Sequence, residues 1–123
     1  MPLPVGVDAA NLLRDRRGIG RYVRALVTLW CTRFAGRIDV TLLVPHAFPR
    51  LVERRLGATL GIAGIRVDHR SAYDRSGLRL IWFPWNGMTW TPHVRSVVTV
   101  HDMWPFVSPP RDARIRVRAQ SHY

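Results

Sequence analysis

Two glycines around one apolar residue form the first segment that could carry chemistry, Gly18-Ile19-Gly20-Arg21-Tyr22. Glycines let a backbone pass close to a phosphate, and the N–H groups at the start of a helix can meet its charge. The segment is not the dinucleotide-binding fingerprint, because Val23 holds the place of the third glycine. It therefore predicts either an anion-binding turn or glycines that simply turn the chain.

An aromatic turn forms the second segment, Trp82-Phe83-Pro84-Trp85-Asn86-Gly87. Aromatic faces near a strand end can stack on sugar rings, and the Asn86 amide can hydrogen-bond a hydroxyl group. We expect Trp82 and Phe83 to be ordinary core residues. Trp85 and Trp90 follow the proline, and we expect these two side chains to border a ligand cleft.

The third segment places His101 next to Asp102 after an apolar run. Neighbouring side chains on an extended strand point to opposite sides, so the two residues are not expected to form a hydrogen-bonded dyad. We expect one of them to face a cleft. The other histidines are isolated and none has a two-histidine metal spacing, so no metal site is expected. No serine lies in a nucleophile elbow, which argues against a hydrolase of that kind.

Alternating strands and helices are expected to position these segments. Buried-type strands are predicted at residues 5–8, 40–44, 65–67, 80–83 and 97–100. An amphipathic helix is predicted from Ile19 to a stop at Gly36, and a second helix from Pro49 to about Leu60. Residues 68–77 are expected to form a surface loop, and residues 111–123 the beginning of a further helix. The order predicts an α/β fold with a Rossmann-like, doubly wound parallel sheet of about five strands, incomplete at its end.

The composition suits one domain with a real core, since 47% of the 123 residues are hydrophobic. The formal charge is +11 and every one of the 19 basic residues is arginine, scattered rather than clustered. Such a charge attracts phosphate-bearing ligands, anionic lipids or nucleic acid, and the charge alone does not indicate which of these is the partner. The first residues lack a secretory signal, no apolar run is long enough to span a membrane, and Cys31 is the single cysteine. We therefore expect a cytoplasmic protein, with peripheral contact to the inner membrane face as an option.

Taken in order, these motifs resemble the first domain of the group 1, family 4 glycosyltransferases, retaining enzymes of the GT-B type with two facing Rossmann-like domains. The resemblance covers residues 1–123 and rests on the order and spacing of four motifs. These are Val5-Gly6-Val7-Asp8-Ala9, Gly18-Ile19-Gly20-Arg21-Tyr22, Phe83-Pro84-Trp85-Asn86 and Val98-Thr99-Val100-His101-Asp102. By this resemblance the chain is the N-terminal, acceptor-side domain of such an enzyme.

The resemblance implies transfer of a hexose, mannose-like, from a nucleotide sugar to a lipid-linked or polysaccharide acceptor, with retained configuration. No metal or cofactor is implied beyond the nucleotide sugar, which is a substrate. The catalytic candidates are His101 and Asp102. The residues implied in binding the substrates are Gly18, Gly20, Arg21, Tyr22, Trp85 and Asn86.

The family holds its donor mainly through a second domain with a basic pair for the diphosphate and an acidic residue for the nucleoside. Neither is found in these 123 residues, so the chain is expected to be a fragment that is inactive without that C-terminal partner domain. One alternative is a non-catalytic module that binds a sugar or nucleotide. Another is a basic protein associated with RNA or a membrane, although no nucleic-acid motif is present.

Overall fold

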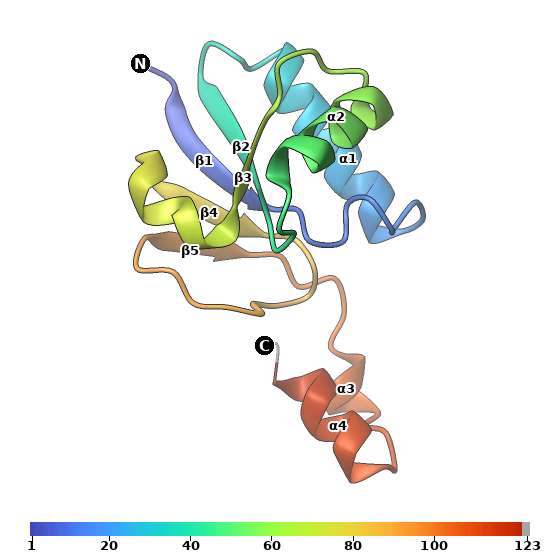
Figure 1. Ribbon diagram of the computed structural model, residues 1–123. Helices are drawn as coiled ribbons and strands as arrows, with labels where there is room; N and C mark the ends of the chain where they lie inside the picture. The colour runs from blue at the N-terminus through green and yellow to red at the C-terminus, as the bar shows by residue number, and fades with distance from the viewer. Residues whose placement is uncertain (122–123) are drawn as a thin grey trace.

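Five strands form one sheet in which all neighbouring strands run parallel, in the order β3-β2-β1-β4-β5 (Figure 1). The computed structural model describes residues 1–121. The strands are β1 (Leu3–Asp8), β2 (Ile38–Val44), β3 (Arg66–His69), β4 (Leu80–Phe83) and β5 (Arg95–Val98). The predicted α/β class with a Rossmann-like parallel sheet is therefore confirmed. Within it, β1 and β2 each begin two residues earlier than predicted.

The first helix, α1 (Ile19–Thr32), begins where the apolar periodicity predicts, with Gly18 at its N-cap. Its predicted stop at Gly36 is wrong. Arg33 still has a right-handed helical backbone, and the next residues form a turn in which the N–H of Arg37 donates to the carbonyl of Phe34. The chain thus leaves the helix through a turn, without a left-handed glycine cap, and enters β2 directly.

The second helix, α2 (Pro49–Leu60), has the predicted bounds. Pro49 fits its first turn because the missing N–H would have no partner inside the helix. Gly61 ends the helix in a left-handed conformation with φ 66°, and its N–H donates to the carbonyl of Gly57. This is the backbone position that favours glycine after a helix.

The predicted surface loop at residues 68–77 is wrong. Strand β3 continues through His69, and Arg70–Ser76 form a 3-10 helix, η1. The Tyr73 ring in η1 is buried, and its hydroxyl oxygen accepts a hydrogen bond of 2.9 Å from the N–H of His93. The composition of this polar segment alone predicts a loop. Burial of its one tyrosine gives the segment an ordered structure instead.

Strand β5 lies two residues earlier than predicted, at Arg95–Val98 instead of 97–100. The reason is its partner strand. Val98 pairs with Phe83, the last residue of β4, and the N–H of Thr99 donates the final hydrogen bond to the carbonyl of Phe83. Because Pro84 follows Phe83, the ladder stops there and His101 lies beyond the strand.

Two apolar layers cover the sheet on opposite faces. Alternate strand residues such as Leu42 and Trp82 pack with α1 and α2 on one face. Their sequence neighbours, Leu43 and Phe83, pack with Tyr73 of η1 and with the connection between β4 and β5 on the other. This alternation is the period of two expected of strands that are buried on both faces.

Two short helices follow β5 and lie apart from the sheet, next to one another (Figure 1). The first, α3 (Trp104–Val107), was not expected from the sequence. The second, α4 (Ala113–Gln120), occupies the predicted C-terminal helix and is capped by Asp112, whose carboxylate accepts the N–H groups of Arg114 and Ile115. The last two residues of the predicted range lie outside the described part of the chain. Within residues 1–121, no helix is long and apolar enough to cross a bilayer.

Candidate functional site

The carboxyl ends of β1 and β4 lie side by side where the strand order reverses. In open parallel sheets, ligands bind beyond the strand ends at such a reversal. Trp85, which follows β4, donates a hydrogen bond of 2.7 Å from its indole Nε1 to the main-chain oxygen of Asp8, the last residue of β1. This contact holds the carboxyl ends of β1 and β4 together.

Asn86 holds the segment that follows β5. Its side-chain Oδ1 accepts a hydrogen bond of 2.5 Å from the N–H of His101, and its Nδ2 lies 3.4 Å from Oδ2 of Asp102. Asn86 itself has a left-handed backbone with φ 62°, which asparagine adopts more readily than most residues. The strained backbone aims the amide at His101 and Asp102, so these residues form one connected unit.

The His101 imidazole is fixed in one orientation. Its Nε2 lies 2.9 Å from the main-chain oxygen of Pro84. A carbonyl oxygen can only accept a hydrogen bond, so the neutral ring carries its proton on Nε2 and leaves the lone pair on Nδ1. The arrangement can therefore offer a hydrogen-bond or proton acceptor at the exposed edge of the sheet.

Tyr22 connects this imidazole to the start of α1. The two rings meet edge to face, with centroids 5.3 Å apart, and Tyr22 also meets the Trp82 ring at 6.0 Å. Because Tyr22 lies in the first turns of α1, the glycine turn and the His101 imidazole lie at the same edge of the sheet.

The N–H groups of the glycine turn are already bonded to a carboxylate of the protein itself. The Asp15 carboxylate accepts the N–H of Arg17 at 3.0 Å through Oδ1 and the N–H of Gly20 at 3.1 Å through Oδ2. Gly20 packs so tightly on this loop that an added Cβ would lie 1.9 Å from the Asp15 carbonyl oxygen, whereas Gly18, with φ 48°, has open space around it. A phosphate at this turn would therefore meet the Gly18 backbone and would compete with Asp15 for the N–H of Gly20.

The structure brings the predicted site residues to one edge but joins only some of them by contacts. Direct contacts link Tyr22, Asn86, His101 and Asp102. The others lie around these four, at the start of α1 or after β4: Gly18, Gly20, Arg21 and Trp85. The Arg21 side chain is exposed, so it is available to an anionic ligand.

Trp90 lies beside the buried Asp8 carboxylate, and its indole lowers the pKa of that group. Its ring packs against Tyr73 and Phe83 at centroid distances of 5.4 and 5.3 Å, as part of the apolar layer on the η1 face. The connection between β4 and β5 crosses that face, and an indole there covers apolar surface that would otherwise be exposed.

Asp8 is a buried carboxylate at this edge that was not predicted as a site residue. It is 3% exposed, and its Oδ1 accepts the N–H of Ala10 at 3.0 Å. Burial raises the pKa of Asp8, and this effect outweighs the Ala10 hydrogen bond, the positive charge of Arg70 and the nearby Trp90 indole, which all lower it. An acidic residue at the very end of a buried apolar strand was the sequence signal that could have identified it.

The raised pKa predicts how an Asp8→Asn variant behaves. Between the ordinary value of 3.8 and the raised folded-state pKa, the folded protein binds more protons than the unfolded chain, so Asp8 makes stability fall as pH rises. Asparagine keeps an acceptor for Ala10 without the charge. We expect the variant to unfold at a higher urea concentration than the wild type at pH 7, and the difference to shrink as the pH is lowered toward 4. If the stability of the variant, measured relative to the wild type, were lower at pH 7 than at pH 4, this assignment would be contradicted.

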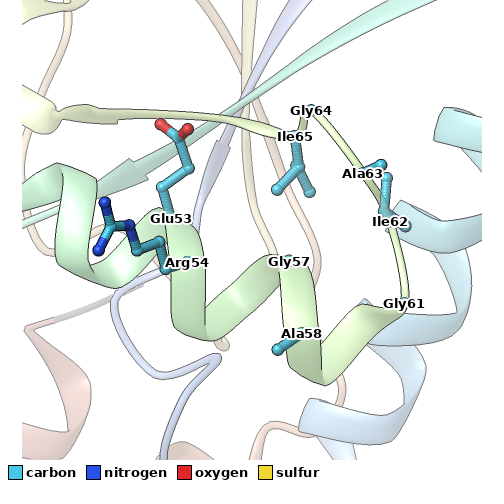
Figure 2. A pocket seen from close by; sticks show the side chains of 9 residues that line it. All are labelled: Glu53, Arg54, Gly57, Ala58, Gly61, Ile62, Ala63, Gly64 and Ile65. Carbon is cyan, nitrogen blue, oxygen red and sulfur yellow. The ribbon is translucent and has the colours of Figure 1, made fainter.

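A hollow away from this edge lies between α2 and the connection that leads to β3 (Figure 2). It is lined by glycines and small apolar residues, and Glu53 and Arg54 provide the charged side chains at one end. Its location beside Gly61 and Gly64, before β3 begins, separates it from the carboxyl ends of the strands. We attribute it to the glycines that shape this connection.

Within the described residues, no group of three or more His, Cys, Asp or Glu side chains could hold a metal ion. Comparison of the chain with models of known protein families, with curated proteins and with solved structures gave no match in any of the three. The function of this chain must therefore be inferred from the geometry of this edge.

Proposed function

We propose that this chain is the acceptor-side, Rossmann-like half of a retaining glycosyltransferase, which transfers a hexose from a nucleotide sugar to a lipid-linked or polysaccharide acceptor. The observation that carries the proposal is the contact between Tyr22, which follows the glycine turn, and His101, which follows β5. It brings the glycine turn at the start of α1 and a hydrogen-bond acceptor to one edge of a parallel sheet, where ligands of such folds bind.

In the proposed reaction, the bond from the anomeric carbon to the diphosphate breaks and a bond to the acceptor oxygen forms on the same face. The acceptor proton leaves with the diphosphate. The lone pair on His101 Nδ1 accepts a hydrogen bond from a hydroxyl of the hexose or acceptor, and Pro84 and Asn86 hold the ring and its backbone. Asp102 orients the turn after β5 through its contact with Asn86.

Stabilising the departing diphosphate is the largest electrostatic demand of this reaction. Asp15 already takes the Gly20 N–H at the start of α1, so the glycine turn supplies only part of that stabilisation. We propose that a second, facing Rossmann-like domain supplies the rest. The chain by itself should then show no transfer.

The test measures transfer of radiolabelled hexose from a panel of nucleotide sugars to lipid-linked and polysaccharide acceptors. The chain is assayed alone and fused ahead of the donor-binding domain of a retaining glycosyltransferase. We expect background counts for the chain alone and transfer by the fusion. Turnover by the chain alone would refute the need for a second domain, and no transfer by any fusion would count against the reaction.

In an active fusion, a His101→Ala substitution is expected to lower the transfer rate by about a hundredfold, the size of effect seen when one hydrogen bond that is made in the transition state is removed. His93→Ala is the matched control, since it removes an exposed imidazole from the connection between β4 and β5 and should leave the rate unchanged. Equal rates for the two variants would remove His101 from the proposed mechanism.

The Asp15 carboxylate also favours a second candidate, a non-catalytic module that binds a neutral sugar. A carboxylate at the helix start repels phosphate but can accept hydrogen bonds from hydroxyl groups. Titration calorimetry separates the two functions. Micromolar binding of a free sugar by the unfused chain, without transfer by the fusion, would favour the module.

A further inference from the structure

An apolar groove runs along one flank of α1, where the sheet continues from β1 to β4 and β5. Its volume is about 350 Å³. At one end are Tyr22 and Thr99, beside the carboxyl ends of the strands. At the other end are Leu3 and Ile38, which pair with one another at the first residues of β1 and β2. The groove therefore starts at the candidate site and crosses the sheet to its opposite edge.

The two faces of β4 and β5 are covered to different extents. On one face, Trp90 packs on Phe83 and belongs to an apolar layer. On the other face, α1 packs mainly on β2 and α2 on β3, so the groove beside α1 stays open. Val97 of β5 and Tyr22 of α1 line it and are 48% and 42% exposed. Exposed apolar surface that is gathered in one groove marks contact with an apolar partner.

The lining of the groove offers few polar groups. Among the residues that the structure describes, none that lines it is charged. The Trp82 ring lines it from β4 and meets Trp30 edge to face, at a centroid distance of 5.0 Å. The Trp82 indole N–H already donates a hydrogen bond of 2.7 Å to the hydroxyl of Thr99. A sugar chain in this groove would leave hydroxyl groups without partners, at a cost in free energy, whereas a hydrocarbon chain would not.

Tyr22 connects the groove to His101. Its ring lines the groove and also meets the His101 imidazole, at a centroid distance of 5.3 Å. A molecule with an apolar chain in the groove would therefore carry its polar end beside the His101 ring, where the proposed reaction places the acceptor hydroxyl. The position of the groove relative to the site thus matches an acceptor with a hydrocarbon tail.

We propose that this groove binds the hydrocarbon chain of a lipid-linked acceptor, and that the protein thereby selects lipid-linked acceptors over polysaccharides. The identity of the acceptor rests on the proposed transfer reaction, but binding of the hydrocarbon does not need that reaction. A second copy of the protein is a less suitable occupant, because two molecules that each carry a formal charge of +11 repel one another.

Nuclear magnetic resonance of the isotope-labelled, unfused chain tests the binding. The probes are methyl, hexyl and octyl glucoside, all below their micelle concentrations. Their neutral head group avoids the non-specific attraction of an anionic lipid to this basic protein. We expect octyl glucoside to bind about tenfold more tightly than hexyl glucoside, because two further methylene groups leave water. Methyl glucoside should cause no shift, and equal affinity for the hexyl and octyl probes would overturn the proposal.

The tryptophans report where the probe binds. The indole N–H signals of Trp30 and Trp82, which line the groove, should shift with octyl glucoside. The signals of Trp90, on the opposite face, and of Trp104, in α3, should stay in place. Shifts of Trp104 equal to those of Trp82 would indicate adsorption on any exposed apolar surface and would overturn the proposal. Shifts of the groove signals with protein concentration alone would place a second copy in the groove and would overturn it as well.

Neighbouring valines of β5 provide matched variants. Val97 lines the groove, whereas Val98 faces the opposite side of the sheet, because side chains alternate along a strand. Val97→Glu should weaken octyl glucoside binding by about tenfold or more, since it places a charge against the alkyl chain. Val98→Glu should change binding by less than about twofold. Equal losses in the two glutamate variants would exclude the groove.

A milder variant guards against unfolding. Val97→Thr keeps the branched shape and should weaken octyl glucoside binding by about fourfold, the equivalent of one methylene group. Circular dichroism and the urea midpoint check that each variant is folded. Binding by a folded Val97→Thr variant as tight as that of the wild type would contradict the proposed contact.

The choice of acceptor is tested in an active fusion. The octyl glycoside of an accepted sugar should have a KM about tenfold or more below that of its methyl glycoside, and Val97→Glu should remove most of this difference. Equal KM values for the two glycosides would refute the selection of lipid-linked acceptors and leave the transfer reaction in place. If no fusion shows transfer, octyl glucoside binding by the unfused chain still decides whether the groove holds a hydrocarbon chain.

Discussion

Replacing Gly20 by alanine is expected to lower the free energy of unfolding by about 3 kcal/mol, the upper range for a side chain forced into occupied space. The added Cβ would lie 1.9 Å from the carbonyl oxygen of Asp15 and 2.8 Å from its carboxylate carbon. The obstacle is backbone, so the loop must move, and the hydrogen bond from Gly20 to Asp15 is lost with it. Urea unfolding followed by circular dichroism measures the change.

Gly36→Ala is the matched control, because nothing lies within 4 Å of a Cβ at that position and its backbone φ is not positive. That variant should be as stable as the wild type or slightly more stable, since alanine restricts the unfolded chain. If the two alanine variants were equally stable, Gly20 would not be packed against Asp15 in solution.

Replacing Trp82 by alanine should have an even larger effect, a loss of about 4 kcal/mol, as for other large buried aromatic side chains. Trp82 is 5% exposed and packs edge to face on Tyr22 and on Trp30, at centroid distances of 6.0 and 5.0 Å. Its indole Nε1 also donates a hydrogen bond of 2.7 Å to the hydroxyl of Thr99. The variant should therefore lose stability and also release the segment that carries His101.

Both effects are measurable on the same sample, as the urea midpoint and as the nuclear magnetic resonance signals of the His101 ring. Trp104→Ala provides the comparison, since this tryptophan lies in α3 and is 48% exposed. It should cost less than about 1 kcal/mol and leave the His101 signals in place. Unchanged His101 signals in the Trp82 variant would show that this side chain does not position the site.

Local sequence signals predicted the elements whose ends are determined locally. Pro49 and Gly61 define α2 through backbone geometry that neighbouring residues do not alter, and the apolar period starting at Ile19 gives the correct start of α1. The bounds of β5 could not be obtained in this way, because they are set by where β4 ends. The 3-10 helix was missed for a similar reason, since Tyr73 is buried in a cluster with Leu43, Phe83 and Trp90, which are distant in the sequence.

The candidate site was predictable in its location, because parallel strands place their carboxyl ends at one edge of a sheet. Its electrostatics were not predictable. Nothing in the spacing indicates that Asp15 folds back onto the N–H of Gly20, or that Asp8 is 3% exposed. Both facts depend on how one loop packs on α1 and β4.

The hydrogen bond from Trp85 to the Asp8 carbonyl connects residues that are 77 positions apart in the sequence. During folding, β1 can pair with β2 after a short crossover, but it can pair with β4 only after the intervening chain has condensed. Closing so long a loop is slow, because its entropy is lost before its contacts form. The edge that carries His101 should thus form last on the folding pathway. A ligand bound there would stabilise only those molecules in which β4 has already paired with β1.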